Sequence, residues 1–146
     1  MTPFSSSSKR RPREYLTGKE VRKLVERARS RGGYGHRDAT MILVAYRHGL
    51  RASELCALRW DQVDLEGGLV HVRRLNNGTP SVHLMGGSGI RALRRLKREK
   101  IESRYVFVTE RRAPKTAAGF RKMVARTGET GKFPFPARPH MLRHTA

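Results

Sequence analysis

The spacing of apolar residues changes twice along this sequence of 146 residues, and these changes limit the possible folds most strongly. A capping box, Thr17-Gly-Lys-Glu20, precedes apolar residues at helical spacing between positions 21 and 28. Residues 69–74 and 81–84 instead alternate between apolar and polar, as half-buried strands do, and Asn77-Gly78 between them favours a hairpin turn. Helical spacing returns over residues 90–97. The pattern predicts a mainly α fold with a small antiparallel β-sheet.

The same helical spacing, together with capping and turn residues, predicts the remaining elements. A second helix is expected over residues 37–48, since its dense apolar run indicates burial and Gly49 is a natural left-handed C-cap. A short third helix is expected near residues 52–58. Further along the chain we expect a strand at 105–109, a helix capped by Thr116, a proline-rich loop over 131–139 and a helix that begins at His140.

The charge balance is far from that of an average soluble domain. Lysine and arginine total 32 against 12 acidic residues, so the formal net charge is +20. Such a chain attracts polyanions at long range, and nucleic acid is the commonest polyanionic partner. The alternatives are a basic surface that is merely solvated, a ribosome-associated protein, or a membrane surface as the partner. The length fits a single domain with a modest hydrophobic core.

The first 14 residues differ in composition from the rest. They are serine-rich and then strongly basic, with Lys9, Arg10 and Arg11 in a row. We expect a flexible basic arm over residues 1–14, which either tracks phosphates or is simply solvated, followed by one domain over residues 15–146. Since no apolar run is long enough for a membrane span and Cys56 is the single cysteine, we expect no membrane, no disulfide and a cytoplasmic, nucleoid-associated location.

Two basic clusters lie far apart in the sequence. Arg51 comes just after the expected C-cap, and His140-x-x-Arg143 opens the last expected helix, where the i, i+3 spacing places both side chains on one face. If Arg51 faces them, two guanidinium groups and an imidazole converge. Such a group can hold a phosphodiester by charge-assisted hydrogen bonds without a metal. Spacing alone is equally compatible with a solvated basic face.

The segments around these clusters resemble the two signature boxes of tyrosine recombinases, the lambda-integrase family. The first is His48-Gly-Leu-Arg51-Ala-Ser-Glu54-Leu followed by Leu58-Arg-Trp-Asp61, and the second is Pro139-His140-Met-Leu-Arg143-His144. Their order, their separation and the intervening hairpin all agree. Tyr15-Leu-Thr-Gly-Lys-Glu-Val and Arg73-Arg-Leu-x-Asn-Gly are similar to the short recombinases that invert the fimbrial phase switch.

The resemblance implies a recombinase catalytic-domain fold and a role for each matching residue. Arg51 and Arg143 would clamp the scissile phosphate, His140 would hydrogen-bond it and assist proton transfer, and Glu54 would brace the site. Arg73 and Arg74, with the basic arm, would contact duplex DNA. In the family a tyrosine attacks the phosphate and forms a 3′-phosphotyrosine, which needs no cofactor and no metal. Double-stranded DNA and other recombinase protomers are the implied partners.

Two departures from the family pattern bear on activity. The family's general-acid lysine on the hairpin aligns with Asn76, and an amide cannot protonate a leaving oxygen. The family nucleophile lies beyond the second box, and Tyr15, Tyr34, Tyr46 and Tyr105 match no nucleophile position. We therefore expect a catalytic domain that is incomplete at its C-terminus and binds DNA without cutting it.

Three biological settings fit this expectation. The chain could be the remnant of a mobile element or inversion system, or one part of an intact enzyme. Alternatively, it could be a non-catalytic DNA-binding protein that occupies or competes for recombination sites.

Overall fold

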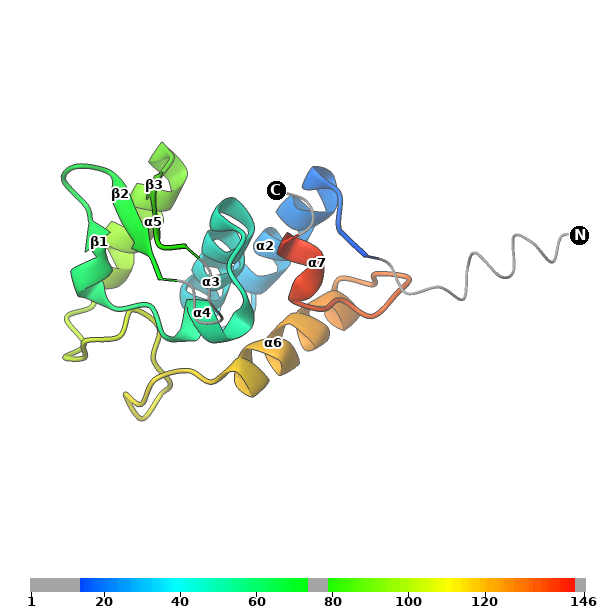
Figure 1. Ribbon diagram of the computed structural model, residues 1–146. Coiled ribbons are helices and arrows are strands. Elements are labelled where there is room, and N and C mark those ends of the chain that lie inside the picture. Colours follow the sequence, from blue (N-terminus) through cyan, green and yellow to red (C-terminus); the bar gives the residue numbers. More distant parts are fainter. Residues whose placement is uncertain (1–13, 74–78, 144–146) are drawn as a thin grey trace, which may run out of the picture.

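The computed structural model describes residues 14–73 and 79–143, and it is mainly helical with one small antiparallel sheet, as predicted (Figure 1). The described elements are α2 (Gly18–Arg29), α3 (Gly35–His48), α4 (Ala52–Cys56), a 3-10 turn η1 (Trp60–Gln62), β1 (Val63–Asp64), β2 (Leu69–Val72), β3 (Ser81–Leu84), α5 (Gly87–Lys97), α6 (Ala117–Thr130) and α7 (His140–Arg143).

Helix α2 begins as the sequence predicts. The Thr17 hydroxyl accepts a hydrogen bond of 3.1 Å from the Glu20 amide, and the Glu20 carboxylate accepts one of 2.9 Å from the Thr17 amide. These two bonds satisfy amides that would otherwise have no partner in the first turn. The apolar side of the helix, which consists of Val21, Leu24, Val25 and Ala28, is buried against the rest of the domain.

Helix α3 packs against α2, α4, α5 and α7, so it organises the whole domain (Figure 1). It starts at Gly35, two residues before the expected position, and ends at Gly49, whose φ of 62° and ψ of 38° confirm the left-handed C-cap. A side chain cannot be accommodated at Gly35, because a Cβ atom there would lie 2.2 Å from the Arg29 carbonyl oxygen. This close approach sets the tight turn between α2 and α3.

The sheet has the order β1-β2-β3, and the predicted hairpin of β2 and β3 is confirmed. Val70 and Val72 of β2 point into the core and pair with His83 and Ser81 of β3. Strand β1 was not predicted, since two residues leave no readable alternation. The turn at residues 74–78, with Asn77-Gly78, lies outside the described residues.

The strand predicted at residues 105–109 is wrong. The segment forms two isolated antiparallel bridges, Arg59 with Tyr105 and Val108 with Pro114, instead of a continuous ladder. Its apolar residues are nevertheless buried, and Phe107 is fully inaccessible. The run of buried apolar residues at 106–108 shows that the segment packs on the core. Among the described residues, its pairing is limited to these two bridges.

The C-terminal part places α7 on α3. Thr116 caps α6 as predicted, since its hydroxyl accepts a hydrogen bond of 3.0 Å from the Gly119 amide. The loop over 131–139 then returns the chain to α7, whose Met141 and Leu142 are buried. The Leu16 amide donates a hydrogen bond of 3.2 Å to the Met141 carbonyl oxygen, so the entry to α2 and the helix α7 lie side by side.

Within the described segments, no helix is both long enough and apolar enough to span a membrane. In the same segments, no group of three or more histidine, cysteine or acidic side chains is arranged to hold a metal ion.

Candidate functional site

The two predicted boxes meet at one pocket. A cavity of about 610 Å³ is lined by Arg51 from the start of α4 and by His140 and Arg143 from α7. Helix α6 contributes a further part of the lining. The structure thus brings together three side chains that the sequence separates by almost ninety positions. We call this cavity the basic pocket; its full lining is Arg51, Ala52, Ser53, Ala117, Arg121, Lys122, Ala125, Pro136, Ala137, Arg138, Pro139, His140 and Arg143.

The backbone at Arg51 is held from both sides. Arg51 is the N-cap residue of α4, with an extended φ of −71° and ψ of 157°. Its amide donates a hydrogen bond of 2.9 Å to Oε1 of Glu54, and its carbonyl oxygen accepts one of 2.9 Å from the Leu55 amide. Glu54 is buried, so its carboxylate position is restricted. The Arg51 side chain is exposed and reaches the pocket from this fixed point.

Arg143 is fixed by a bond to the first box. Its Nε donates a hydrogen bond of 3.3 Å to the carbonyl oxygen of Gly49, the left-handed cap residue of α3. A guanidinium group has five N–H donors, so the bond through Nε leaves the terminal nitrogens to face the pocket. Gly49 and Arg51 are two residues apart, and one short segment therefore aligns both arginines.

Three further cationic residues line the pocket, and the sequence reasoning missed them. Arg121 and Lys122 come from α6, and Arg138 comes from the loop before α7. The signal was present, because the buried side of α6 leaves Arg121 on the opposite side, between the small residues Ala117 and Ala125. None of the residues that line this pocket is acidic. Their charges therefore add, and the pocket suits an anion.

His48 lies at the end of α3, three residues before Arg51. It is buried, and its Nδ1 is 3.1 Å from Nδ1 of His83 on β3. Burial, followed by the neighbouring His83 and Arg47, lowers the pKa of His48 from 6.5 to about 4. The ring is therefore neutral at physiological pH. Sequence reasoning missed this pair because the two residues lie 35 positions apart in elements of different type.

The remaining predicted contact residues are only partly described. Arg73 is exposed and directly follows β2. Arg74 and Asn76 on the hairpin turn, and Lys9, Arg10 and Arg11 in the basic arm, lie outside the described residues. Their roles stay predictions from the sequence.

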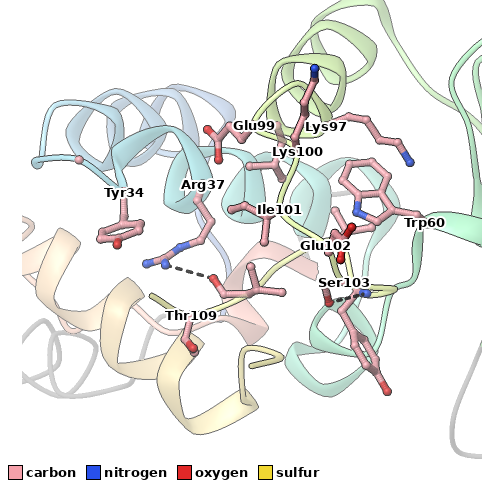
Figure 2. A pocket seen from close by; sticks show the side chains of 15 residues that line it. Tyr34, Arg37, Trp60, Lys97, Glu99, Lys100, Ile101, Glu102, Ser103 and Thr109 are labelled. Atoms are coloured by element: carbon pink, nitrogen blue, oxygen red, sulfur yellow. Dashed lines mark hydrogen bonds between the residues drawn. The ribbon is translucent and has the colours of Figure 1, made fainter. Parts of the chain in front are cut away.

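The four tyrosines lie away from the basic pocket lining. Tyr34 and Tyr105 line a different cavity of about 540 Å³, which shares no lining residue with the basic pocket (Figure 2). There Arg37 donates a hydrogen bond of 3.2 Å to the Val108 carbonyl oxygen. Tyr46 belongs to α3, and Tyr15 precedes α2 with 52 % of its surface exposed.

Known proteins with similar sequences are regulators and recombinases. Residues 14–146 match the phage integrase family. The type 1 fimbriae regulatory protein FimE of Escherichia coli K12 is 35 % identical over 138 residues, which cover 90 % of this chain and 69 % of FimE. The tyrosine recombinase XerC of Xanthomonas axonopodis pv. citri is 39 % identical over 116 residues, 76 % of this chain and 37 % of XerC.

Solved structures agree on the fold. The XerA recombinase superposes with a TM-score of 0.78 at 27 % identity, over 92 % of this chain and 49 % of XerA. A lambda integrase dimer bound to a COC′ core site gives 0.75 at 20 % identity, over 93 % of this chain and 40 % of that chain. The present chain thus spans about half of these proteins or less. The match over residues 14–146 and the identity to FimE show that the chain belongs to the phage integrase family of tyrosine recombinases.

Proposed function

We propose that this chain is a DNA-binding catalytic-domain fragment of a tyrosine site-specific recombinase, and that the basic pocket holds a DNA phosphate. The observation that carries this proposal is the convergence of Arg51, His140 and Arg143 on one cavity without an acidic residue in its lining. A lining with several cationic and no acidic side chains attracts an anion and neutralises the charge of a bound phosphodiester.

The geometry supports a different contact to the phosphate for each of the three side chains. Arg51 and Arg143 approach from two elements and offer planar donor pairs, which fit the non-bridging oxygens of a phosphodiester bidentately. His140 can donate a third hydrogen bond. In the complete reaction, such donors stabilise the negative charge of the pentacoordinate transition state. Glu54 acts on the backbone of Arg51, and it is a positioning residue in this scheme.

The surrounding cations extend the contact to neighbouring phosphates. Arg121, Lys122 and Arg138 lie at the same pocket, and Arg73 is exposed at the hairpin. Duplex DNA carries closely spaced phosphates on each strand, so several of these side chains can bind at once. Phosphate contacts fix the position of a protein on DNA without selecting a sequence. We therefore expect strong binding with weak sequence preference.

The proposal includes an absence of covalent chemistry by a polypeptide of these 146 residues. Strand cleavage in this family needs a tyrosine hydroxyl in line with the phosphorus. None of the four tyrosines lines the basic pocket, and Tyr34 and Tyr105 line a separate cavity. Binding of DNA by the arginines and histidine does not depend on that hydroxyl.

Fluorescence anisotropy with a labelled mixed-sequence duplex tests the function. We expect binding at low salt that weakens steeply as salt rises, because each neutralised phosphate releases counterions. Heparin, a polyanion without base pairs, should compete with the duplex for binding. An uncharged polymer should not compete. Absence of binding at low salt, or binding that is independent of salt, contradicts the proposal.

A non-catalytic protein that occupies recombination sites is the second candidate. The observation that favours it is that none of the four tyrosines is among the residues that line the basic pocket. Both candidates place the protein with double-stranded DNA, beside other recombinase protomers, and in the bacterial cytoplasm with the nucleoid. They differ in vivo: a part of an enzyme supports recombination once a relative's C-terminal segment with the nucleophile is joined to it, whereas the natural role of a site-occupying protein is to lower recombination by an intact recombinase at a shared site.

A further inference from the structure

Two imidazole rings join the end of α3 to the hairpin. His48 is the last residue of α3, and His83 lies in the middle of β3. Their Nδ1 atoms are 3.1 Å apart, and their ring planes are inclined at 44°. On its other side, Nε2 of His83 is 2.9 Å from the Ser81 hydroxyl oxygen. The contacts form a chain from α3 through His83 to the beginning of β3.

The distances require a defined placement of protons. Two nitrogen atoms at 3.1 Å form a hydrogen bond only if one carries a proton and the other has its lone pair available. Two neutral rings meet this condition in either direction, and Ser81 can donate or accept to suit. A single added proton on His83 also leaves the bond intact. Protonation of both rings places N–H against N–H, and the bond is lost.

The charges around the pair oppose that second protonation. Arg47 precedes His48 on α3, and Arg51 and Arg143 lie at the same end of that helix. Arg91 of α5 lies beside the Gly86-Gly87 turn together with Arg47. Glu54 of α4 is an acid of this region, and its carboxylate accepts a hydrogen bond from the Arg51 amide. A buried His48 among these cations retains its neutral form.

The pair lies where the parts of the basic pocket are joined. His48, Gly49 and Arg51 fall within four consecutive residues: the His48 ring contacts the hairpin, the Gly49 carbonyl oxygen contacts Arg143, and the Arg51 amide contacts Glu54. A shift of the hairpin relative to His48 thus changes where Arg73 lies relative to Arg51.

We propose that His48 and His83 are positioning residues, and that the hydrogen bond between their Nδ1 atoms fixes the β2–β3 hairpin against the Arg51 segment so that both contact DNA together. The part that concerns DNA rests on the proposed function, whereas the coupling of the hairpin to α3 does not. Neither residue touches the phosphate in this scheme.

Hydrogen exchange measured on the whole chain without DNA tests the coupling. His83→Leu removes the bond, and His83→Asn keeps a hydrogen-bonding atom near the Nδ1 position. His71→Leu is the matched control, because His71 is exposed on the opposite face of the same hairpin. We expect His83→Leu to speed exchange in residues 69–84 several-fold while α2 stays unchanged. His83→Asn should restore most of the protection, and His71→Leu should have no effect.

Two further measurements separate this role from ordinary packing. Ring titration by NMR should show the pKa of His48 near 4 in the native chain and partly raised in His83→Leu, because one of its causes is removed while burial remains. His48→Leu combined with His83→Leu should speed hairpin exchange no more than either change alone. An unchanged pKa of His48, or additive effects on exchange, overturns the pairing.

Duplex binding provides the link to function. We expect a several-fold weaker affinity in His83→Leu and wild-type affinity in His71→Leu. If His83→Leu loosens the hairpin but leaves affinity unchanged, the DNA part of the inference is wrong. If the native chain binds no duplex at all, the proposed function fails while the exchange data still decide the coupling. If His48→Leu does not fold, substitution of the partly buried His83 alone still tests the coupling through exchange and the pKa of His48.

Discussion

The Nε of Arg143 donates a hydrogen bond of 3.3 Å to the carbonyl oxygen of Gly49, across 94 residues of sequence. This bond exists because α3 ends in a left-handed residue, which turns its carbonyl group away from the helix toward α7. The first box therefore contributes both a side chain, Arg51, and a backbone acceptor that orients the arginine of the second box. The two boxes form one unit through the α3 C-cap.

Removal of Arg51 or Arg143 is expected to weaken duplex binding. Arg51→Ala and Arg143→Ala should each cost about 1–3 kcal/mol, because a charge-assisted contact to phosphate is lost. Arg95→Ala is the matched control: Arg95 is exposed on α5 and is not among the pocket lining, so its loss should cost less than about 1 kcal/mol. Anisotropy titrations compare the three, with circular dichroism as the check on folding. Equal small losses would mean that the arginine pair is only part of a diffuse surface.

The cations on α6 predict a change in salt dependence. Arg121→Ala should reduce the slope of log affinity against log salt by about one, since one phosphate contact disappears. Arg126 on the same helix, exposed but absent from the pocket lining, is the control, and Arg126→Ala should leave the slope nearly unchanged. Titrations at several salt concentrations give both slopes. An equal decrease for the two variants would show that α6 contributes only general charge.

Local signals in the sequence were sufficient for most of the fold. The Thr17–Glu20 capping box and the Gly49 cap depend on neighbouring residues, so they could be predicted without tertiary information. The strand expected at residues 105–109 failed because strand formation needs a partner of matching length, which a local pattern cannot report. The apolar run there signalled burial alone, since Val106, Phe107 and Val108 are all buried.

Only those residues of the candidate site that belong to sequence motifs could be predicted. Arg51 and the pair His140 and Arg143 stand in recognisable spacings, but their meeting in one cavity depends on how α7 packs on α3. The helical pattern of α6 places Arg121 opposite the buried side, but arginine is frequent in this chain, and the pattern alone does not say which surface that side faces. Arg138 belongs to no motif. Their place at the pocket follows from the orientation of α6 and the path of the loop after it.

Two glycine substitutions should have opposite effects on stability. Gly35→Ala should destabilise the fold by about 1–3 kcal/mol or more, because its Cβ would lie 2.2 Å from the Arg29 carbonyl oxygen and the α2–α3 turn must shift. Gly89→Ala lies inside α5 with nothing within 4 Å of the added Cβ, and it should stabilise by about 0.5–1 kcal/mol. Urea denaturation measures both. Equal changes in the free energy of unfolding would contradict the packing at Gly35.

Stability should fall on mild acidification because of His48. Its pKa is lowered from 6.5 to about 4 in the folded chain, so the unfolded state binds more protons between these values. The free energy of unfolding therefore decreases as pH falls through this window, by about 2 kcal/mol between pH 7 and pH 5 from this residue. His48→Asn does not titrate there and should flatten that part of the profile. Denaturation at the two pH values checks it, and an equal pH dependence in both proteins would refute the assignment to His48.

A polypeptide of these 146 residues, given a nicked suicide substrate that carries a recombination site, should yield no covalent protein–DNA adduct on a denaturing gel. The reason is that Tyr34 and Tyr105 line the other cavity, and neither Tyr15 nor Tyr46 belongs to the basic pocket lining. An adduct formed by the unmodified chain would show that one of these tyrosines reaches the phosphate.

Addition of a relative's C-terminal segment then tests the hairpin. The added tyrosine should permit cleavage, but slowly, because Asn76 stands where the family has its general-acid lysine and an amide cannot protonate the leaving 5′-oxygen. Asn76→Lys in the extended chain should raise the cleavage rate by about 10²–10⁴, which is typical of a positioned general acid. A substrate with a 5′-phosphorothiolate at the scissile bond has a leaving group that needs no proton, so the two residues should then give equal rates. Equal rates on the ordinary substrate would place the general acid elsewhere, whereas a difference that persists with the phosphorothiolate would mean that residue 76 acts through DNA binding.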